Sequence, residues 1–468
     1  MTPTPRKLES RRRRRGTVLI VTMWILLVLA GLVLVLARAM RVEGDCSANE
    51  VAAMSADAIE QGAIQYVLAS VDGLQGQVPL ETDTPCEAVP VGDGAFWILR
   101  PRSDDDRIYS YGITDEAAKV NLNTATVDML TKLPGMTAEF AASIVDWRDP
   151  DSEVTSGGAE SEYYLMLQDP YECKNSPLET VEELFLVRGA SKEILFAEDV
   201  NRNGILDAGE NPSAFGGSLT TGSRLARGIV NCVTVYSVEP GTTSTGAARV
   251  YINDAQSPAL NALLRRSVSS DRIAGVLDRV RRERPFRNVM DFHFRAGLTI
   301  EEFEKVAPEI TASRGTQRGL INVNTAPKEV LFCLPGLEES DVSALLARRA
   351  TATATATTTA TTTATAQSTS IAWVADVLPR AKAIGVGGLI TGQTFRFSAD
   401  IVSIAANGRA FKRCRVVVDA QTSPPRVLYR QDLTHLGWPL SPDIVTTLRS
   451  GAPLERVVQT VGQGIGQL

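Results

Sequence analysis

The sequence is poor in the residues from which most enzyme centres are built. Only two of its 468 residues are histidines, His293 and His435, and they stand far apart in the chain. This excludes a multi-histidine zinc site and leaves little from which to build a His-based catalytic triad. The six cysteines form no CxxC pair, and neither a Walker A segment nor a GxSxG segment is present. We therefore expect a protein that is not an enzyme.

Charge is unevenly distributed along the chain. The first fifteen residues carry a net charge of +6, whereas the whole chain carries −6, so the body of the protein is strongly acidic. Nucleic-acid binding requires basic groups that neutralise phosphates, and an acidic body argues against it. With 44% hydrophobic and 22% charged residues the composition is that of a folded protein, and the length indicates more than one domain.

An uncharged apolar segment follows the basic arm at residues 17–37. It is long enough to form a transmembrane helix. The basic residues before it place the N-terminus in the cytoplasm by the positive-inside rule, so we expect the rest of the chain to be exported. A cleavable secretory signal is the alternative, but the nearest small-residue cleavage site is flanked by Arg38 and Arg41.

The helical pattern continues beyond the apolar segment. Apolar residues recur at helical spacing along one stripe, so one helix is expected to span residues 17–72. Gly73 is expected to end it, because glycine readily takes the left-handed conformation at a helix C-terminus. The predicted stripe consists of Val51, Met54, Ala58, Ile59, Ala63, Tyr66, Val67 and Ser70.

Strand-like segments occur in two groups separated by a long helical region. Short aromatic and β-branched runs stand at 95–100 and 107–113, and comparable runs return only at 394–403, 411–419 and 426–429. The simplest architecture is an α+β domain whose small antiparallel sheet is interrupted by a large, mostly helical insert, with extra strand candidates at 229–238 and 248–252. The expected divisions are an N-terminal arm (1–16), the long helix (17–72), the first part of the α+β domain (73–115), the insert (116–350), a linker (351–370), the remaining helix and strands (371–440) and a tail (441–468).

Inside the insert the sequence repeats itself. Residues 120–148 align without a gap on residues 321–349, with nine identities that include a Leu-Pro-Gly turn. A degraded third copy at 251–280 keeps Asn253 but lacks this turn. Three helical units stacked in tandem are the simplest interpretation. The Thr/Ala-rich residues after the last copy are too small to bury much surface, and we expect them to form a flexible or extended linker.

The Leu-Pro-Gly turn between two apolar segments resembles a helix-hairpin-helix, in which the turn can present backbone N–H groups to a phosphate. An exported, membrane-anchored DNA-binding protein of the competence type is therefore the rival function. Carboxylates follow the turn in both complete copies, which argues against phosphate binding. They are Glu139 in the first copy and Glu338, Glu339 and Asp341 in the last.

Residues 199–210 satisfy every required position of a twelve-residue calcium loop. Oxygen-bearing side chains occupy positions 1, 3, 5 and 9, glycine occupies position 6 and glutamate position 12. Pro212 disfavours a long exiting helix, so we expect a fixed clamp rather than an opening sensor pair. A polar turn that matches by chance is the alternative. The predicted ligands of Ca²⁺ are Asp199, Asn201, Asn203, the carbonyl of Ile205, Asp207 and Glu210.

A second acidic cluster surrounds a Ser-Gly-Gly loop earlier in the insert. Its spacing alone does not establish a metal site, and a solvated acidic loop is an equal alternative. As paired carboxylates for glycoside hydrolysis, these residues would need a cleft that the sequence does not indicate. The members of this possible second metal region are Asp149, Asp151, Glu160 and Glu162.

Two groups of residues carry a resemblance to known proteins. Basic residues, then Gly16, then an unbroken apolar helix resemble the precursor of a type IV pilin or a type II secretion pseudopilin. The insert segments IVDWRD (144–149), GAESEYY (158–164) and PYECKNSP (170–177), followed by TVEEL (180–184), are similar to the minor pseudopilin of the K type in type II secretion. The extra repeat and the Thr/Ala tract depart from that family's pattern.

The resemblance implies a pilin-like fold and cleavage by a prepilin peptidase between Gly16 and Thr17. It implies a non-catalytic subunit, anchored in the bacterial inner membrane with its bulk in the periplasm, that acts in protein secretion with partners of the I and J types at the tip of the pseudopilus. Major subunits carry a glutamate at the fifth mature position, here Val21, and the K type typically lacks it. The resemblance also implies calcium near the second acidic cluster, and we expect no nucleic-acid partner. Which cysteines pair, and which cargo is secreted, stay open.

Overall fold

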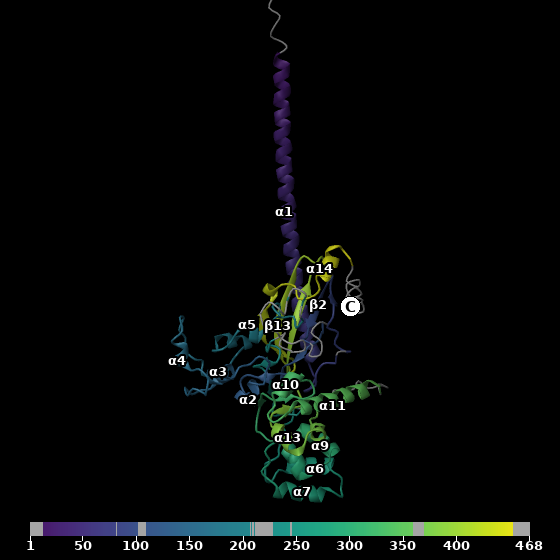
Figure 1. Cartoon of the computed structure of the whole chain (residues 1–468). Helices are drawn as coiled ribbons and strands as arrows, with labels where there is room; N and C mark the ends of the chain where they lie inside the picture. The colour runs from purple at the N-terminus through teal and green to yellow at the C-terminus, as the bar shows by residue number, and fades with distance from the viewer. Residues whose placement is uncertain are drawn as a thin grey trace, which may run out of the picture.

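The computed structural model describes residues 13–80, 82–101, 109–205, 207, 210, 228–243, 246–358 and 369–452. A long N-terminal helix carries a β-sheet at its far end, and the insert extends from the sheet away from that helix (Figure 1). The architecture is therefore a mixture of helix and sheet, as the sequence predicts.

The N-terminal helix, α1 (Arg13–Val71), is one continuous element of 59 residues. At 1.5 Å per residue it extends about 90 Å. Its N-terminal part is long and apolar enough to cross a membrane, and the rest of the chain buries none of that apolar window. Gly73 follows with a φ of 72°, in the left-handed region that glycine enters without a Cβ penalty. The predicted long helix and its end are confirmed.

The main sheet is antiparallel and is built from both sides of the insert. Its strands lie in the order β1-β2-β12-β13-β14, and β3 pairs with β12. Ile98 and Cys414 both pair with Ile401, so segments far apart in the sequence are adjacent here. The strands are β1 (Val89–Val91), β2 (Gly94–Leu99), β3 (Thr114–Asp115), β12 (Arg396–Ile404), β13 (Phe411–Asp419) and β14 (Arg426–Asp432). The predicted interrupted sheet is confirmed.

The C-terminal part of α1 packs on one face of this sheet. Its apolar residues join those of the central strands in a core that includes Ile59, Ala63, Val67, Phe96, Ile98, Phe397, Ile401 and Val416. A smaller core on the other face contains Trp97 and Val402 with residues of the C-terminal helix α14 (Pro442–Arg449), which follows η5 (Thr434–Leu436).

The face that α1 turns to the sheet differs from the predicted stripe. Val51, Met54 and Ala58 are exposed, whereas Ala52 and Ala56 are buried. Small side chains let the helix backbone approach the strands closely, which the apolar count does not show. Glu60 is not among the residues of the predicted stripe, yet it is buried, with Arg430 Nη2 lying 2.6 Å from its Oε1.

The strand predicted at 107–113 is also different. Residues 102–108 lie outside the described residues, and beyond them Tyr111 makes only an isolated bridge to Leu99. Gly112, with a φ of 154°, turns the chain before the ladder can continue, and pairing resumes at β3.

Helices make up most of the regular secondary structure of the insert within the described residues, and the insert also carries several two-residue strands. Its helices are η1 (Glu116–Ala118), α2 (Val127–Leu130), α3 (Ala138–Arg148), α4 (Ser161–Tyr164), η2 (Val181–Leu186), α5 (Lys192–Leu195), α6 (Pro258–Ser267), α7 (Ile273–Arg282), α8 (Val289–Ala296), α9 (Ile300–Val306), η4 (Ala307–Glu309), α10 (Lys328–Phe332), α11 (Glu339–Thr358), α12 (Val374–Val377) and α13 (Arg380–Val386). Its strands are β4 (Val120–Asn121), β5 (Val233–Thr234), β6 (Val238–Glu239), β7 (Val250–Tyr251), β8 (Ile310–Thr311), β9 (Gln317–Arg318), β10 (Ile321–Asn322) and β11 (Ile390–Thr391). The extra strands predicted at 229–238 and 248–252 therefore exist only as β5, β6 and β7.

The three sequence repeats fold as three similar units. Each begins with a short strand that pairs in parallel with another short strand, β4 with β5, β7 with β8 and β10 with β11. Two helices follow each strand, α2 and α3, α6 and α7, or α10 and α11. A shared apolar core runs through all three units, with Leu122, Ile252 and Val323 at equivalent positions. The helix-hairpin-helix assignment of these units stays a prediction.

An asparagine at the same position ties each unit to a later segment. Asn123 bonds both backbone groups of Leu178, with Nδ2 donating to the carbonyl (2.9 Å) and Oδ1 accepting from the N–H (2.8 Å). Asn253 makes the same pair of bonds to Phe286 (2.9 and 2.8 Å). Asn324 donates to the Gly392 carbonyl (3.3 Å). The side-chain amide thus replaces a missing ladder partner at the end of each short strand.

The Thr/Ala tract differs in part from the predicted linker. Helix α11 continues into it as far as Thr358, and residues 359–368 lie outside the described residues. The first turns of α11, around Val342 and Leu345, are packed and therefore serve as the helix nucleus. Further residues can extend an existing helix without a new nucleation step, and alanine favours such extension.

Candidate functional site

The second acidic cluster assembles at two helix ends. Asp149 is the C-cap of α3, and Glu160 precedes the first residue of α4. Asp149, Asp151 and Glu160 each offer a carboxylate oxygen, and these atoms all lie within 4.8 Å of one another. Glu162, predicted with them, is exposed and is not a member of this group. Three of the four predicted residues are thus brought together.

The negative charges of this cluster are poorly balanced by hydrogen-bond donors or positive charges. Glu160 is 3% exposed, and neither of its oxygens has a hydrogen-bond partner among the described residues. Burial, with the negative charges of Asp146 and Asp149, raises the pKa of Glu160. Burial and the charge of Asp151 likewise raise the pKa of Asp149. Asp151 Oδ1 accepts from the Glu153 N–H (2.9 Å), whereas Asp149 Oδ1 and both Glu160 oxygens have no donor among the described residues. Such converging oxygens fit a hard divalent cation such as Ca²⁺, which would supply the missing positive charge.

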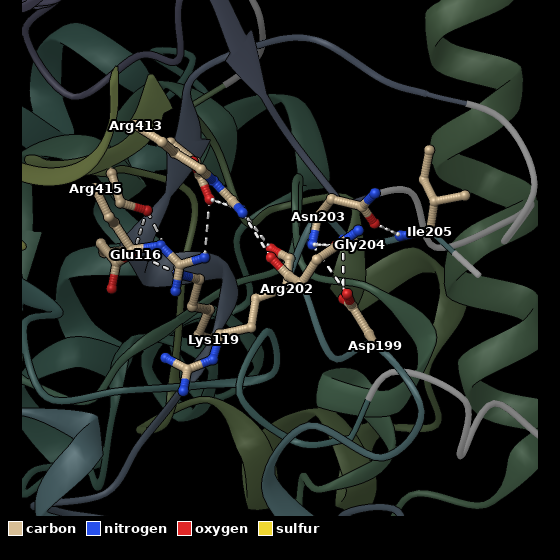
Figure 2. A network of polar contacts seen from close by, with 12 residues as sticks. Glu116, Lys119, Asp199, Arg202, Asn203, Gly204, Ile205, Arg413 and Arg415 are labelled. Carbon is tan, nitrogen blue, oxygen red and sulfur yellow. Dashed lines mark hydrogen bonds and ion pairs between the residues drawn. The ribbon is translucent and has the colours of Figure 1, made fainter. Parts of the chain in front are cut away.

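The loop at 199–210 has the backbone hydrogen bonds of a tight clamp. Asp199 accepts from the N–H groups of Asn203 (2.9 Å) and Gly204 (2.8 Å), and Asn203 Oδ1 accepts from the Ile205 N–H (2.8 Å). Gly204, at position 6, has a φ of 80° that side-chain-bearing residues rarely adopt. Glu210 reaches back from position 12 to accept from the Val200 N–H (2.9 Å). Figure 2 shows these hydrogen bonds between Asp199, Asn203, Gly204 and Ile205.

The predicted ligands of this loop are brought together only in part, and residues 206, 208 and 209 lie outside the described ones. Asn201, Asn203 and Glu210 contact Asp207, but the carboxylates of Asp199, Asp207 and Glu210 do not form one group of oxygens within 4.8 Å of one another. Asp207 Oδ2 accepts from the side-chain amides of Asn201 (2.7 Å) and Asn203 (3.0 Å). These amides supply to Asp207 the positive charge density that an ion would supply. Burial is the main reason that the pKa of Asp199 rises to about 7. The oxygen-only donor set therefore fits calcium.

Residues far away in the sequence hold the loop, and sequence analysis missed them. Arg413 of β13 donates to the carbonyls of Asn201 (2.5 Å) and Arg202 (2.7 Å). The Asn203 amide donates to the Pro439 carbonyl (2.8 Å), and the Tyr109 hydroxyl lies 3.5 Å from Asp207 Oδ1. No local pattern marks these residues, because their roles depend on the pairing of strands on either side of the insert.

The two Leu-Pro-Gly turns face each other, which bears on the rival DNA-binding function. Lys132, next to the first turn, donates to the carbonyl of Leu334 in the second turn (2.8 Å) and lies over the ring of Phe332. Of the carboxylates after the second turn, Asp341 pairs with Lys382 (2.6 Å). This arrangement favours a packing role for the turns over phosphate binding.

The predicted cleavage residues, Gly16 and Thr17, lie near the start of α1. The fold does not test their processing.

Comparison with known proteins concerns the region that holds the acidic cluster. Residues 112–197 match the family model of type II secretion system (T2SS), protein K. These residues carry a protein K domain. The resemblance of the insert segments between residues 144 and 184 to protein K is thereby confirmed, and Asp149, Asp151 and Glu160 all lie within the protein K domain.

Among solved structures, a chain in the crystal structure of the GspK-GspI-GspJ complex of the enterotoxigenic Escherichia coli type 2 secretion system is similar. It is 14% identical, with 84% of this chain and 98% of that chain covered and a TM-score of 0.39. No curated protein matches the sequence significantly. The 199–210 loop begins just after the protein K domain ends.

Proposed function

We propose that the protein is a non-catalytic minor pseudopilin of type II secretion, anchored in the inner membrane before assembly and placed at the tip of the pseudopilus. The observation that carries this proposal is the protein K domain itself, inserted between strands of a sheet that packs on a long apolar helix. Partners of the I and J types would be its neighbours, with the bulk of all three in the periplasm.

The exposed face of α1 supports assembly through helices. Beyond the apolar window, Val51 is 66% and Met54 69% exposed, on a face that the sheet does not cover. Met40, on the same side of the helix, continues this exposed apolar face toward the membrane-spanning part. An apolar helix face left uncovered along its length is suited to packing against the corresponding helices of other subunits.

Two further features support a position at the tip. Val21 stands where a carboxylate in other pseudopilins is thought to meet the N-terminus of the subunit ahead, and a buried charge without a partner is costly in a membrane. The insert, from η1 to β11, also projects from the sheet, away from α1 (Figure 1). Such bulk would crowd a helical stack but has room at an end.

Calcium is proposed at both carboxylate sites, where it would stabilise the insert rather than switch it. When bound, the ion supplies charge and coordination; the chain's own residues provide the oxygens and hold them in place. Among the described residues, the Cys173 thiol lies against Glu160, but burial raises its pKa to about 11 and so keeps it un-ionised, and a structural role is proposed.

Processing tests the family role directly. The full chain, expressed with a prepilin peptidase, should yield a mature protein that begins at Thr17, measured by intact mass. Gly16→Leu should block the cut, whereas Ala39→Leu, at the nearest alternative site, should not. A mature chain that keeps Met1, or one cut after Ala39, would contradict the assignment.

Assembly tests the position. The mature chain should co-purify with I-type and J-type subunits and should label only one end of isolated fibres. Labelling along the fibre length would refute tip placement. Salt-dependent DNA binding by the same preparation would instead favour the competence-type function.

A further inference from the structure

One fully buried arginine connects the sheet to the 199–210 loop. Arg413 on β13 is 0% exposed. Its neighbour Cys414 points into the core beneath α1, and side chains alternate along a strand, so Arg413 points to the opposite face of the sheet. There its Nε and Nη2 donate to the two carboxylate oxygens of Asp400 on β12, at 2.9 and 2.8 Å.

The remaining donors of Arg413 are directed at the loop. Nη1 donates to the carbonyl of Asn201 (2.5 Å) and Nη2 to that of Arg202 (2.7 Å), as Figure 2 shows. A guanidinium can serve a carboxylate and two carbonyls at once because its N–H groups form a rigid planar fork; an ammonium cannot. A buried ion pair is by itself a weak source of stability. The extra contacts to the loop give this pair a specific role.

Residues 201–204 of the loop are also held by contacts that do not involve Arg413. Arg202 has a φ of 56°, unusual for a residue with a side chain, and its carbonyl is one of the two that Arg413 binds. The Asn203 amide donates to Pro439, and a Cβ on Gly204 would come within 3.0 Å of Pro101. Positions 3 to 6 of the loop therefore lie directly against the sheet domain.

We propose that Arg413, held by Asp400, is a positioning residue for the cation site, and that it couples cation binding to docking of the loop on the sheet. This inference rests on the proposed calcium site at 199–210. Arg413 fixes the carbonyls of positions 3 and 4 toward the sheet, which leaves the side chains of Asp199, Asn201 and Asn203 to form the site. Because coupling is reciprocal, an ion in the loop strengthens the attachment of the insert by the same factor as docking raises affinity.

The experiment measures calcium affinity of the full chain in detergent micelles. An Asp149→Asn/Glu160→Gln background removes the other acidic site. In that background Arg413→Lys keeps the positive charge but loses the planar set of N–H donors. We expect it to weaken calcium affinity at least tenfold, measured by calorimetric titration. The matched control is Arg396→Lys: Arg396 of β12 also pairs with an aspartate, Asp419, and donates to an insert carbonyl, that of Tyr236 (2.9 Å). Arg396→Lys should leave affinity unchanged.

Hydrogen exchange gives the local readout. Calcium should slow exchange in the peptide over 199–205, and Arg413→Lys should remove most of this protection. If the variant melts lower by an equal amount with and without calcium while its affinity is unchanged, Arg413 is merely structural and the inference is wrong.

The remaining outcomes are also decisive. If the parent chain shows neither calcium binding nor protection at 199–205, the proposed calcium site fails and the inference with it. If Arg413→Lys does not fold, Asp400→Asn, which keeps the side-chain size, takes its place, and an unchanged affinity in that variant overturns the inference.

Discussion

Glu160→Gln should have opposite effects on stability with and without calcium. Both oxygens of Glu160 are buried without hydrogen-bond partners in the part of the chain that the structure describes, and they lie near the carboxylates of Asp149 and Asp151. Without an ion, the substitution removes a charge that is costly to bury and that repels its neighbours. With an ion, it removes one of the charges that bind the ion. The same change should therefore stabilise the apo protein and weaken the gain from calcium.

The magnitudes follow from the geometry. Two unit charges 4.8 Å apart repel by about 3 kcal/mol at an effective dielectric constant near 20, and partial protonation reduces this, so we expect apo stabilisation of about 1–2 kcal/mol. Calcium at a hundredfold excess over its dissociation constant stabilises the parent protein by about 2.7 kcal/mol. A tenfold loss of affinity in the variant reduces that gain to about 1.4 kcal/mol. For an insert of this size, each kcal/mol shifts the melting temperature by about 2–4 °C.

The assay is thermal unfolding of the full chain in detergent, with free calcium and with chelator. Glu162→Gln is the matched control, because Glu162 is a nearby exposed carboxylate outside the cluster. It should change neither melting temperature by more than about 1 °C, since surface substitutions have small effects. If Glu160→Gln lowers the melting temperature in chelator, or leaves the calcium gain intact, the cluster is not an ion site.

Two further predictions concern the insert. Burial lowers the pKa of His293 to about 4, so its stabilising contribution is complete above pH 6.5 and is lost as the pH falls toward 4. His293→Phe should remove about 2–3 kcal/mol of acid destabilisation measured by urea unfolding at pH 7 and pH 4.5, whereas the exposed His435→Gln should not. Arg349 donates to the carbonyls of Val323 (3.3 Å) and Ala326 (2.8 Å), so Arg349→Met should cost about 2 kcal/mol of unfolding free energy. The exposed neighbour Arg348→Met should cost almost nothing, and equal losses would refute the reasoning.

Sequence patterns predict the parts of this fold that depend on local periodicity. An unbroken apolar run continued at helical spacing up to a glycine predicts α1, and a short run with aromatic and β-branched residues predicts β13 (Phe411–Asp419) at its observed bounds. The two-residue strands are too short to show a period, so β4, β10 and β11 are not predictable in this way. The face of α1 is misjudged for another reason: Glu60 is buried only because Arg430, far away in the sequence, pairs with it.

The residues of the 199–210 site also fall into those that local spacing predicts and those that it does not. The ligands of the 199–210 loop lie within twelve residues, so spacing alone predicts that they converge. The groups that hold this loop come from β12, β13 and the segment before α14, and no spacing rule connects them to it. An insert between two strands is covalently joined to its sheet only at the two ends. Additional ties must come from side chains that meet after folding, such as Arg413 with the loop carbonyls. A cation in that loop would stabilise one of these ties, which is how a local ion site could affect the attachment of the whole insert.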